Sequence, residues 1–281
     1  MFTARQLIDT ARALAFKQQG QLAPNADPSA QLAVRRPGVR VAAKQLARYR
    51  HCCGLPAGER TLPVAFVETL FVGPLAELAI MPQFPVQPLG LIHLRQTISQ
   101  HRAIESSATL DLCCRLAEVA TSERGVEMTC ELEVDEAGER VWQGSIYFLS
   151  RKTQSAGGAR KAGQHAAPLD ENRTLHQVAE DMGRQYAMAS GDYNPHHLHR
   201  LTARPLGYKR PIVHGMWTLA RALGLLGTIP PAVEIDAQFK RPLYLPGTFS
   251  FAYLERDGQT TFEVRNPQNN EPHLLGSLRA R

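Results

Sequence analysis

The sequence feature that most constrains the fold is a weak internal repeat. Each half of the chain offers one long apolar segment of helical character and then several runs in which apolar and polar residues alternate. This alternation has the period of strands with one buried face, and turn residues such as Asp135 and Gly138 separate the runs. One helix against a mainly antiparallel sheet, formed twice, is the α+β arrangement that this order favours.

The expected elements follow the same order in both halves. In the first half a helix is expected over residues 61–80, and strands are expected over 89–98, 108–120, 125–135 and 140–150. In the second half a helix is expected over 210–227, and strands are expected over 233–245, 248–258, 260–266 and 274–278. The spacing of apolar residues also predicts an amphipathic helix over 3–18, followed by a looser basic stretch.

Residues 150–172 separate the two halves. They contain few large apolar side chains and the pair Gly157-Gly158, which is typical of a linker or a mobile loop. The sequence therefore predicts an N-terminal unit at 1–150 that includes the leading helix, a linker at 151–172 and a C-terminal unit at 173–281.

The composition argues against a secreted or membrane protein. The beginning of the chain lacks the basic start, apolar middle and small-residue cleavage site of a secretory signal. The most apolar stretch, residues 62–84, is interrupted by three prolines and two glutamates, so it is too polar to span a bilayer. We expect this stretch to form a buried helix and the protein to have no membrane partner.

The cysteines and the net charge indicate the cellular compartment and the kind of binding partner. The five cysteines include two adjacent pairs and no C-x-x-C spacing, which fits free thiols in a reducing cytoplasm. The net charge of +6 comes from scattered Lys and Arg residues, so nucleic acid is not the expected partner. An acidic small molecule fits the sign equally well, and both coenzyme A and the phosphopantetheine arm of an acyl carrier bear phosphate.

Residues 186–216 concentrate the chemically useful side chains. Turn-forming residues from Ser190 to Pro195 end the preceding helix and place Asp192 and His197 on an irregular loop. A carboxylate and an imidazole five residues apart can share a proton or a water molecule, as acid–base catalysis requires. The alternative is structural, because an Asp in a turn often only accepts hydrogen bonds from its own backbone.

Two further features of this segment have alternative explanations. His196, His197 and His199 suggest a metal, but adjacent residues point in different directions and no distant carboxylate or cysteine set completes a shell, so no metal is expected. Residues 211–216 begin the second long helix, which puts the backbone N–H groups near Gly215 at its positive end. Such N–H groups can stabilise an oxyanion, although a glycine there can also serve close packing alone.

The motif residues resemble the signature of one family. SGDYNPHH at 190–197, followed by Ala203, Gly207-Tyr208 and PIVHGM at 211–216, is similar to the signature of the MaoC-like dehydratase and (R)-specific enoyl-CoA hydratase family. The resemblance implies an α+β double hotdog fold, in which each of two units wraps an antiparallel sheet around a long central helix. It also implies a hydro-lyase of fatty-acid metabolism that hydrates trans-2-enoyl thioesters, or dehydrates (R)-3-hydroxyacyl thioesters, without a cofactor.

The resemblance also implies residue roles. The catalytic Asp and His of the family fall on Asp192 and His197, and the oxyanion donor falls on the backbone N–H of Gly215. Asn194 is implied to hold the loop and His214 to position the start of the helix. The residues expected at the substrate are Tyr193, Asn194 and His214. The sequence does not assign the individual proton transfers to Asp192 or His197.

Some positions depart from the family pattern. His196 stands where an aliphatic residue is usual, which is expected to make the mouth of the pocket more polar, and Leu223 replaces a hydroxyl-bearing residue of some members. The first half has Phe66 and Val67 where the second half has its His-Gly pair. We therefore expect the first unit to be a degenerate hotdog that completes the acyl tunnel.

Two other functions remain as alternatives. A hotdog protein without catalysis would bind an acyl thioester, and a hotdog thioesterase would attack the carbonyl carbon instead of the β-carbon. The Asp and His pair favours the hydratase over both. The substrate carrier is coenzyme A or acyl carrier protein, and a homodimer is an option that the sequence leaves open.

Overall fold

A computed structural model describes residues 32–152, 167–169 and 171–281. The helix expected over 3–18 and most of the linker expected over 151–172 lie outside these residues.

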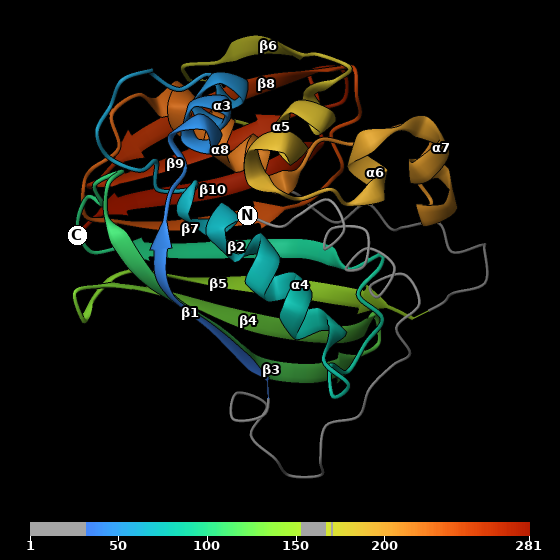
Figure 1. Cartoon of the computed structure of the whole chain (residues 1–281). Coiled ribbons are helices and arrows are strands. Elements are labelled where there is room, and N and C mark those ends of the chain that lie inside the picture. The colour runs from blue at the N-terminus through green and yellow to red at the C-terminus, as the bar shows by residue number, and fades with distance from the viewer. Residues whose placement is uncertain (1–31, 153–166, 170) are drawn as a thin grey trace.

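The strands of the described residues form one antiparallel sheet with a mirrored order. The order is β1-β3-β4-β5-β2-β7-β10-β9-β8-β6, so each strand of the first half has its counterpart at the same distance from the centre (Figure 1). The first-half strands are β1 (Ala33–Arg40), β2 (Ile92–Gln100), β3 (Thr109–Ser122), β4 (Gly125–Glu136) and β5 (Glu139–Arg151). The second-half strands are β6 (Thr174–Val178), β7 (Val233–Phe239), β8 (Gly247–Arg256), β9 (Gln259–Arg265) and β10 (Pro272–Ala280).

The two halves join through β2 and β7. These strands pair antiparallel from Arg95 opposite Gln238 to Gln100 opposite Val233. The Arg95 guanidinium makes a bidentate contact with Asp236 across the junction, at 2.9 Å from Nε and 2.5 Å from Nη2. Both side chains are partly exposed, so the continuous backbone ladder contributes more to the junction than this ion pair.

The helices lie on one face of the sheet (Figure 1). The first-half helices are α3 (Ala43–Cys53), the 3₁₀ helix η1 (Val67–Phe71) and α4 (Val72–Ile80). The second-half helices are α5 (Met182–Ser190), α6 (Pro195–Leu198), α7 (Arg200–Ala203), η2 (Arg204–Leu206) and α8 (Gly215–Leu226). Helix α3 packs on α5 and α8 of the other half, and the Trp217 indole of α8 donates to the Cys52 carbonyl of α3 at 2.8 Å.

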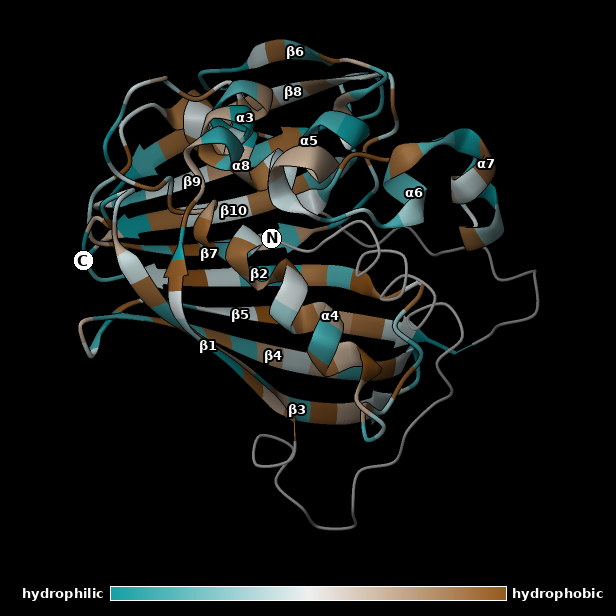
Figure 2. Cartoon of the chain, in the orientation of Figure 1, coloured by the Kyte–Doolittle hydropathy of each residue, from teal (hydrophilic) through white to brown (hydrophobic). Residues whose placement is uncertain are grey.

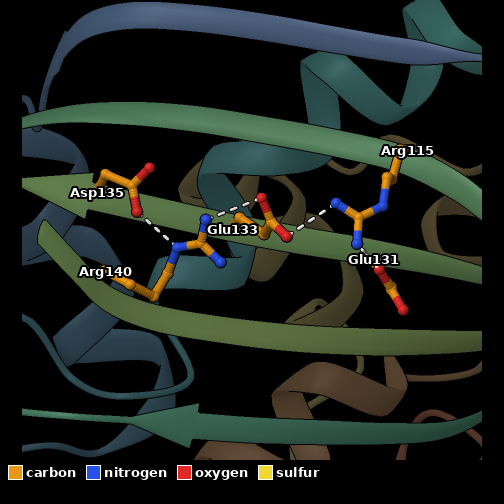
Figure 3. A network of polar contacts seen from close by, with 5 residues as sticks. All are labelled: Arg115, Glu131, Glu133, Asp135 and Arg140. Carbon is orange, nitrogen blue, oxygen red and sulfur yellow. Dashed lines mark hydrogen bonds and ion pairs between the residues drawn. The ribbon is translucent and has the colours of Figure 1, made fainter. Parts of the chain in front are cut away.

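Alternation along the strands separates the core from the outer face. In β4, Cys130, Leu132 and Val134 are buried while the residues between them are partly exposed, and the hydropathy colours alternate in the same way (Figure 2). On the outer face, five charged residues of β3, β4 and β5 form a network of ion pairs (Figure 3). They are Arg115, Glu131, Glu133, Asp135 and Arg140.

The structure confirms the α+β fold and all eight expected strands, with shifted ends. The short strand expected over 274–278 extends over Pro272–Ala280. All five cysteines are free and buried, as expected. Among the described residues no helix is both long and apolar enough to cross a membrane.

Both expected long helices begin later than the sequence predicted. In the first, residues 61–66 are held by other contacts: Thr61 bridges to Glu105, and the Trp142 indole donates to the Val64 carbonyl. In the second, residues 212 and 213 pair with the backbone of Leu243 and Tyr244 before the helix begins at Gly215. Tertiary hydrogen bonds thus replace the first helical turns that local apolarity suggested.

The looser stretch expected after residue 18 is wrong where the structure describes it. Residues 33–53 contain β1 and α3. Strand β1 lies at the sheet edge and exposes most of its side chains, several of them basic, so its pattern lacked a clear apolar face. Helix α3 presents a narrow buried face, which includes Leu46 and Tyr49.

Candidate active site

The end of α5 fixes Asp192 in a tight loop. Gly191 terminates the helix with φ = 84°, a left-handed conformation that glycine adopts without strain. The Ser190 hydroxyl donates to the Tyr186 carbonyl at 2.8 Å and accepts from the Asp192 N–H at 3.1 Å. Asp192 Oδ1 then accepts the Asn194 N–H at 3.1 Å. The turn-forming residues of the motif therefore orient the Asp192 carboxylate from its own backbone.

The next turn holds His197 against the core. Pro195 opens the one-turn helix α6, and His197 is buried within it. Its Nδ1 lies 2.8 Å from the Ile212 carbonyl oxygen, which can only accept, so Nδ1 carries the proton. Because Nδ1 is protonated, Nε2 of the neutral ring carries a lone pair and can act as an acceptor. A Cβ built on Gly183 would lie 2.0 Å from the His197 carbonyl oxygen, so α5 packs closely on this turn because Gly183 has no side chain.

His214 joins the loop to the start of α8. Its Nε2 lies 2.9 Å from the backbone oxygen of Asp192 and 3.8 Å from the carboxylate atom Oδ2. The rings of His214 and His197 stack with centroids 3.5 Å apart and planes at 25°. The loop, the one-turn helix and the N-terminus of α8 are thereby brought together.

Gly215 is the first residue of α8. The first N–H groups of a helix have no acceptor within it, so the Gly215 N–H can bind an external oxygen. A Cβ built on Gly215 would lie 3.0 Å from Cδ1 of Phe239, so this position is also tightly packed. The packing role and the oxyanion role that the sequence left open are both compatible with this geometry.

Burial keeps the histidines of the cluster neutral. Burial lowers the pKa of His214 to about 3, against the hydrogen bond to the Asp192 carbonyl. Burial lowers the pKa of His197 well below its ordinary value, and the neighbouring His214 and His196 lower it further, while Asp192 opposes the shift. A neutral His197 can accept a proton, which a protonated imidazole cannot.

The other sequence-predicted residues have different surroundings. Tyr193 is exposed at 46%, and the Asn194 backbone caps the turn, so both lie on the loop beside Asp192. The effect of His196 on the polarity of the pocket mouth stays a prediction. His196 is buried, with its ring centroid 4.0 Å from that of His197 and 5.3 Å from that of Tyr208.

Among the described residues, Asp192, His197 and His214 form a group whose ligand atoms lie close enough together to consider a metal. One ligand atom from each lies within 4.8 Å of the others. Tetrahedral zinc ligands lie about 3.4 Å from one another, given zinc–ligand distances of about 2.0–2.2 Å. The His214 nitrogen that faces the Asp192 carboxylate, Nε2, is the one that donates to a backbone carbonyl, so it has no lone pair for a metal and we assign no metal to these residues.

Residues of the first half that the sequence did not predict lie near this cluster. Asp192 acts electrostatically on both Glu68 of η1 and His93 of β2. The His93 ring centroid lies 4.6 Å from that of Phe239, and burial lowers the pKa of His93 to about 4. The sequence signal for Glu68 was a charged residue inside an apolar run, while His93 carried no comparable signal.

Comparison with solved structures defines the class of protein. A crystal structure of HtdX from Mycobacterium tuberculosis matches with a TM-score of 0.78 and 24% identity, over 89% of this chain and 100% of that chain. A MaoC-like dehydratase from Phytophthora capsici matches with a TM-score of 0.73 and 15% identity, over 92% of this chain and 99% of that chain. The chain is therefore a hotdog-fold protein.

Sequence comparison identifies the domain. Residues 161–273 match the family model described as a MaoC like domain. The 3-hydroxyacyl-thioester dehydratase X of Mycobacterium tuberculosis is 27% identical, over 83% of this chain and 84% of its own length. The peroxisomal enoyl-CoA hydratase 2 of Arabidopsis thaliana is 27% identical, over 75% of each chain. The chain thus contains a MaoC-like dehydratase domain, which confirms the interpretation of the motif.

Proposed function

We propose that the protein is a hydro-lyase that hydrates trans-2-enoyl thioesters and, in reverse, dehydrates (R)-3-hydroxyacyl thioesters. The observation that carries the proposal is one loop cluster that holds a carboxylate at Asp192, a neutral imidazole at His197 and the free helix N-terminus at Gly215. The names of the two curated relatives, a 3-hydroxyacyl-thioester dehydratase and an enoyl-CoA hydratase, support the same reaction.

The reaction needs a water molecule and a stabilised enolate. The Asp192 carboxylate and His197 Nε2 are two acceptors, so they can orient both hydrogens of one water and direct its oxygen lone pair at the β-carbon. As the oxygen–carbon bond forms, the electron pair of the double bond moves towards the α-carbon and the thioester oxygen. The Gly215 N–H would stabilise that oxygen, by about 3–4 kcal/mol for a well-aimed donor.

The protons then balance the addition. One proton leaves the water for the Asp192–His197 pair, and one proton is delivered from this pair to the α-carbon. The net change is addition of one water molecule, and each residue returns to its starting state. Dehydration is the reverse sequence through the same groups.

The substrate-binding residues are proposed to act around this pair. Asn194 would fix the loop through its backbone, and His214 would tie the loop to α8 through the Asp192 carbonyl. Tyr193, which is exposed beside the pair, would contact the substrate near the entrance. The thioester would be carried by coenzyme A or acyl carrier protein, and the activity would belong to fatty-acid metabolism in the cytoplasm.

The chain is proposed to consist of two hotdog units. The N-terminal unit at 1–150 would be degenerate, 151–172 would link the units, and the C-terminal unit at 173–281 would be catalytic. The mirrored strand order around the β2–β7 junction supports this division. In this arrangement the first unit would cover the acyl group bound by the second.

Crotonyl-CoA tests the reaction and separates it from the alternatives. We expect loss of the enoyl absorbance without release of free thiol, and no effect of a metal chelator on the rate. Free thiol released at the rate of substrate loss would indicate a thioesterase. Binding of the acyl-CoA without either change would indicate a non-catalytic binding protein.

A further inference from the structure

The segment after the loop that carries Asp192 has an unbalanced charge. No Asp or Glu occurs between Asp192 and Glu234, whereas five Lys and Arg residues do, and the net charge of the whole chain is +6. Five of the six excess positive charges therefore belong to this one segment. Lys and Arg residues occur throughout the chain, so the imbalance comes from the missing carboxylates.

Four of these five cations are exposed. Arg221 lies on α8, where it donates to the carbonyls of Cys53 and Gly54. The other four are exposed and form the basic surface, which consists of Arg200, Arg204, Lys209 and Arg210. Among the described residues none of these four forms an ion pair with a carboxylate, and the Arg210 guanidinium lies 5.6 Å from the ring centroid of Tyr244.

Helix geometry brings these cations together with an exposed leucine. The Arg204 N–H donates to the Arg200 carbonyl, which is the α-helical bond between residues four apart, so the two arginines lie one turn apart on the same side. Leu201 is 69% exposed and three residues before Arg204, so it lies beside Arg204. The Tyr208 N–H donates to the last carbonyl of α7 at 3.2 Å, which keeps Lys209 near the end of this helix.

The same part of the chain holds most of the exposed large apolar side chains. Among the described residues four such side chains are exposed, and three of them lie between residues 188 and 201. They are Met188 of α5, Tyr193 of the loop after α5 and Leu201 of α7, and these elements lie next to one another at one side of the molecule (Figure 1). Single apolar residues are ordinary on a surface, whereas a group of them beside charged residues is typical of a contact surface for another protein.

The basic surface is attached firmly to the turn that carries His197. The Thr202 hydroxyl of α7 donates to the Pro195 carbonyl at 2.6 Å, and Pro195 opens the one-turn helix that contains His197. The Tyr208 ring centroid lies 5.3 Å from that of His196. A partner bound to α7 would therefore be held beside the proposed catalytic pair.

The arrangement fits an acidic protein better than free coenzyme A. Phosphate groups are bound by cations that converge on them, whereas Arg200 and Arg204 stand exposed on the outside of a helix. A phosphate also gains nothing from Leu201, whose apolar surface is removed from water only by an apolar contact. A protein surface with carboxylates around an apolar side chain would complement both features.

We propose that the basic surface, together with Leu201, is the docking site for an acyl carrier protein, the acidic protein that would present the thioester. Carboxylates of the carrier would pair with Arg200, Arg204 and Lys209. The phosphopantetheine arm of the docked carrier would bring the acyl group to the proposed catalytic pair. This inference rests on the proposed hydration, and it narrows the substrate class to thioesters of a carrier protein.

Hydration of a crotonyl group on two carriers tests the docking. In Arg200→Glu/Arg204→Glu, KM for the crotonyl-loaded acyl carrier protein of the same organism should rise by ~10-fold or more, while kcat stays within ~3-fold. Both constants for crotonyl-CoA should stay within ~3-fold of the wild type. The matched control is Arg35→Glu/Arg256→Glu, which reverses two exposed arginines on β1 and β8 and should leave the constants for both substrates unchanged.

Binding of a carrier that lacks the phosphopantetheine arm gives a second test, which needs no catalysis. Its dissociation constant from the wild type should rise by ~10-fold or more between about 0.05 and 0.5 M salt, because exposed charges are screened. This rise should be less than ~3-fold in Arg200→Glu/Arg204→Glu. Leu201→Ser should weaken binding by ~5-fold or more at every salt concentration, since an apolar contact is not screened.

The contrary results are distinct. An unchanged KM for the loaded carrier in Arg200→Glu/Arg204→Glu would overturn the inference. An equal rise in KM for crotonyl-CoA would also overturn it, because the surface would then bind a phosphate that both substrates share. If the wild type hydrates neither substrate but still binds the carrier without its arm in a salt-dependent way, the proposed reaction fails and the docking site stands.

Discussion

The buried carboxyl group of Glu68 makes a quantitative prediction about stability. Its pKa is about 8 in the folded protein and 4.5 in its ordinary environment. Between these values the folded protein holds one proton more than the unfolded chain does. Stability from this group is therefore fully present below about pH 4.5 and is lost as pH rises through about 8. Glu68→Gln should remove this pH dependence.

The magnitude follows from the width of the window. For each pH unit between the two pKa values, the free energy of unfolding of the wild type falls by about 1.4 kcal/mol relative to a variant whose residue 68 does not titrate. Across the window the difference in unfolding free energy between Glu68→Gln and the wild type should grow by about 5 kcal/mol. It should reach a plateau above about pH 8, where both states of the wild type are ionised.

Urea unfolding at several pH values between 5 and 9 measures this difference. Histidines and other carboxyl groups also titrate in this range, but they are common to both proteins and cancel in the comparison. The control Glu123→Gln removes an exposed carboxylate between β3 and β4 and should show no such trend. If the difference between Glu68→Gln and the wild type stays constant with pH, Glu68 is not buried in its neutral form and the electrostatic argument is wrong.

Three further predictions concern packing. Gly215→Ala should lower kcat by ~10-fold or more, because the added methyl group would lie beside the backbone N–H and 3.0 Å from Phe239. The free energy of unfolding should change by about 1 kcal/mol or less. If kcat is unchanged in a variant whose melting temperature is also measured, the oxyanion role is ruled out. Gly183→Ala should destabilise the protein, by ~2 kcal/mol or more, since a Cβ there lies 2.0 Å from the His197 carbonyl oxygen; a wild-type melting temperature would contradict this contact. A fragment beginning at Asn172 should be inactive and poorly soluble, because β7 and the helices α5 and α8 would lose their first-half partners. A fragment that is soluble by sedimentation and active in a turnover assay would contradict this prediction.

The sequence predicted the strands well because their alternation reports burial directly. In β4 each buried residue from Cys130 to Val134 follows a partly exposed one, so its period was visible without any tertiary information. The helix starts were predicted poorly for the converse reason. The Trp142 indole, 78 positions along the chain, takes the Val64 carbonyl that a helix would have used.

The site was partly predictable for similar reasons. Asp192 lies on the loop after α5 and His197 lies in the one-turn helix α6 that follows, so the turn residues between them are local and the sequence indicated that the two lie together. The protonated Nδ1 of His197 depends on the Ile212 carbonyl, and the close approach of Gly191 to Val72 depends on packing between the two halves. Neither contact has a local sequence pattern.

The turnover of Asp192→Asn and His197→Ala with crotonyl-CoA tests the central claim most directly. We predict that each variant folds and that each loses ~100-fold or more in kcat, the effect expected when a positioned acid–base group is removed. His199→Ala, an exposed histidine of the same segment, is the control and should keep kcat within ~3-fold. Turnover within ~3-fold of the wild type in folded Asp192→Asn or folded His197→Ala would contradict the proposed hydration mechanism.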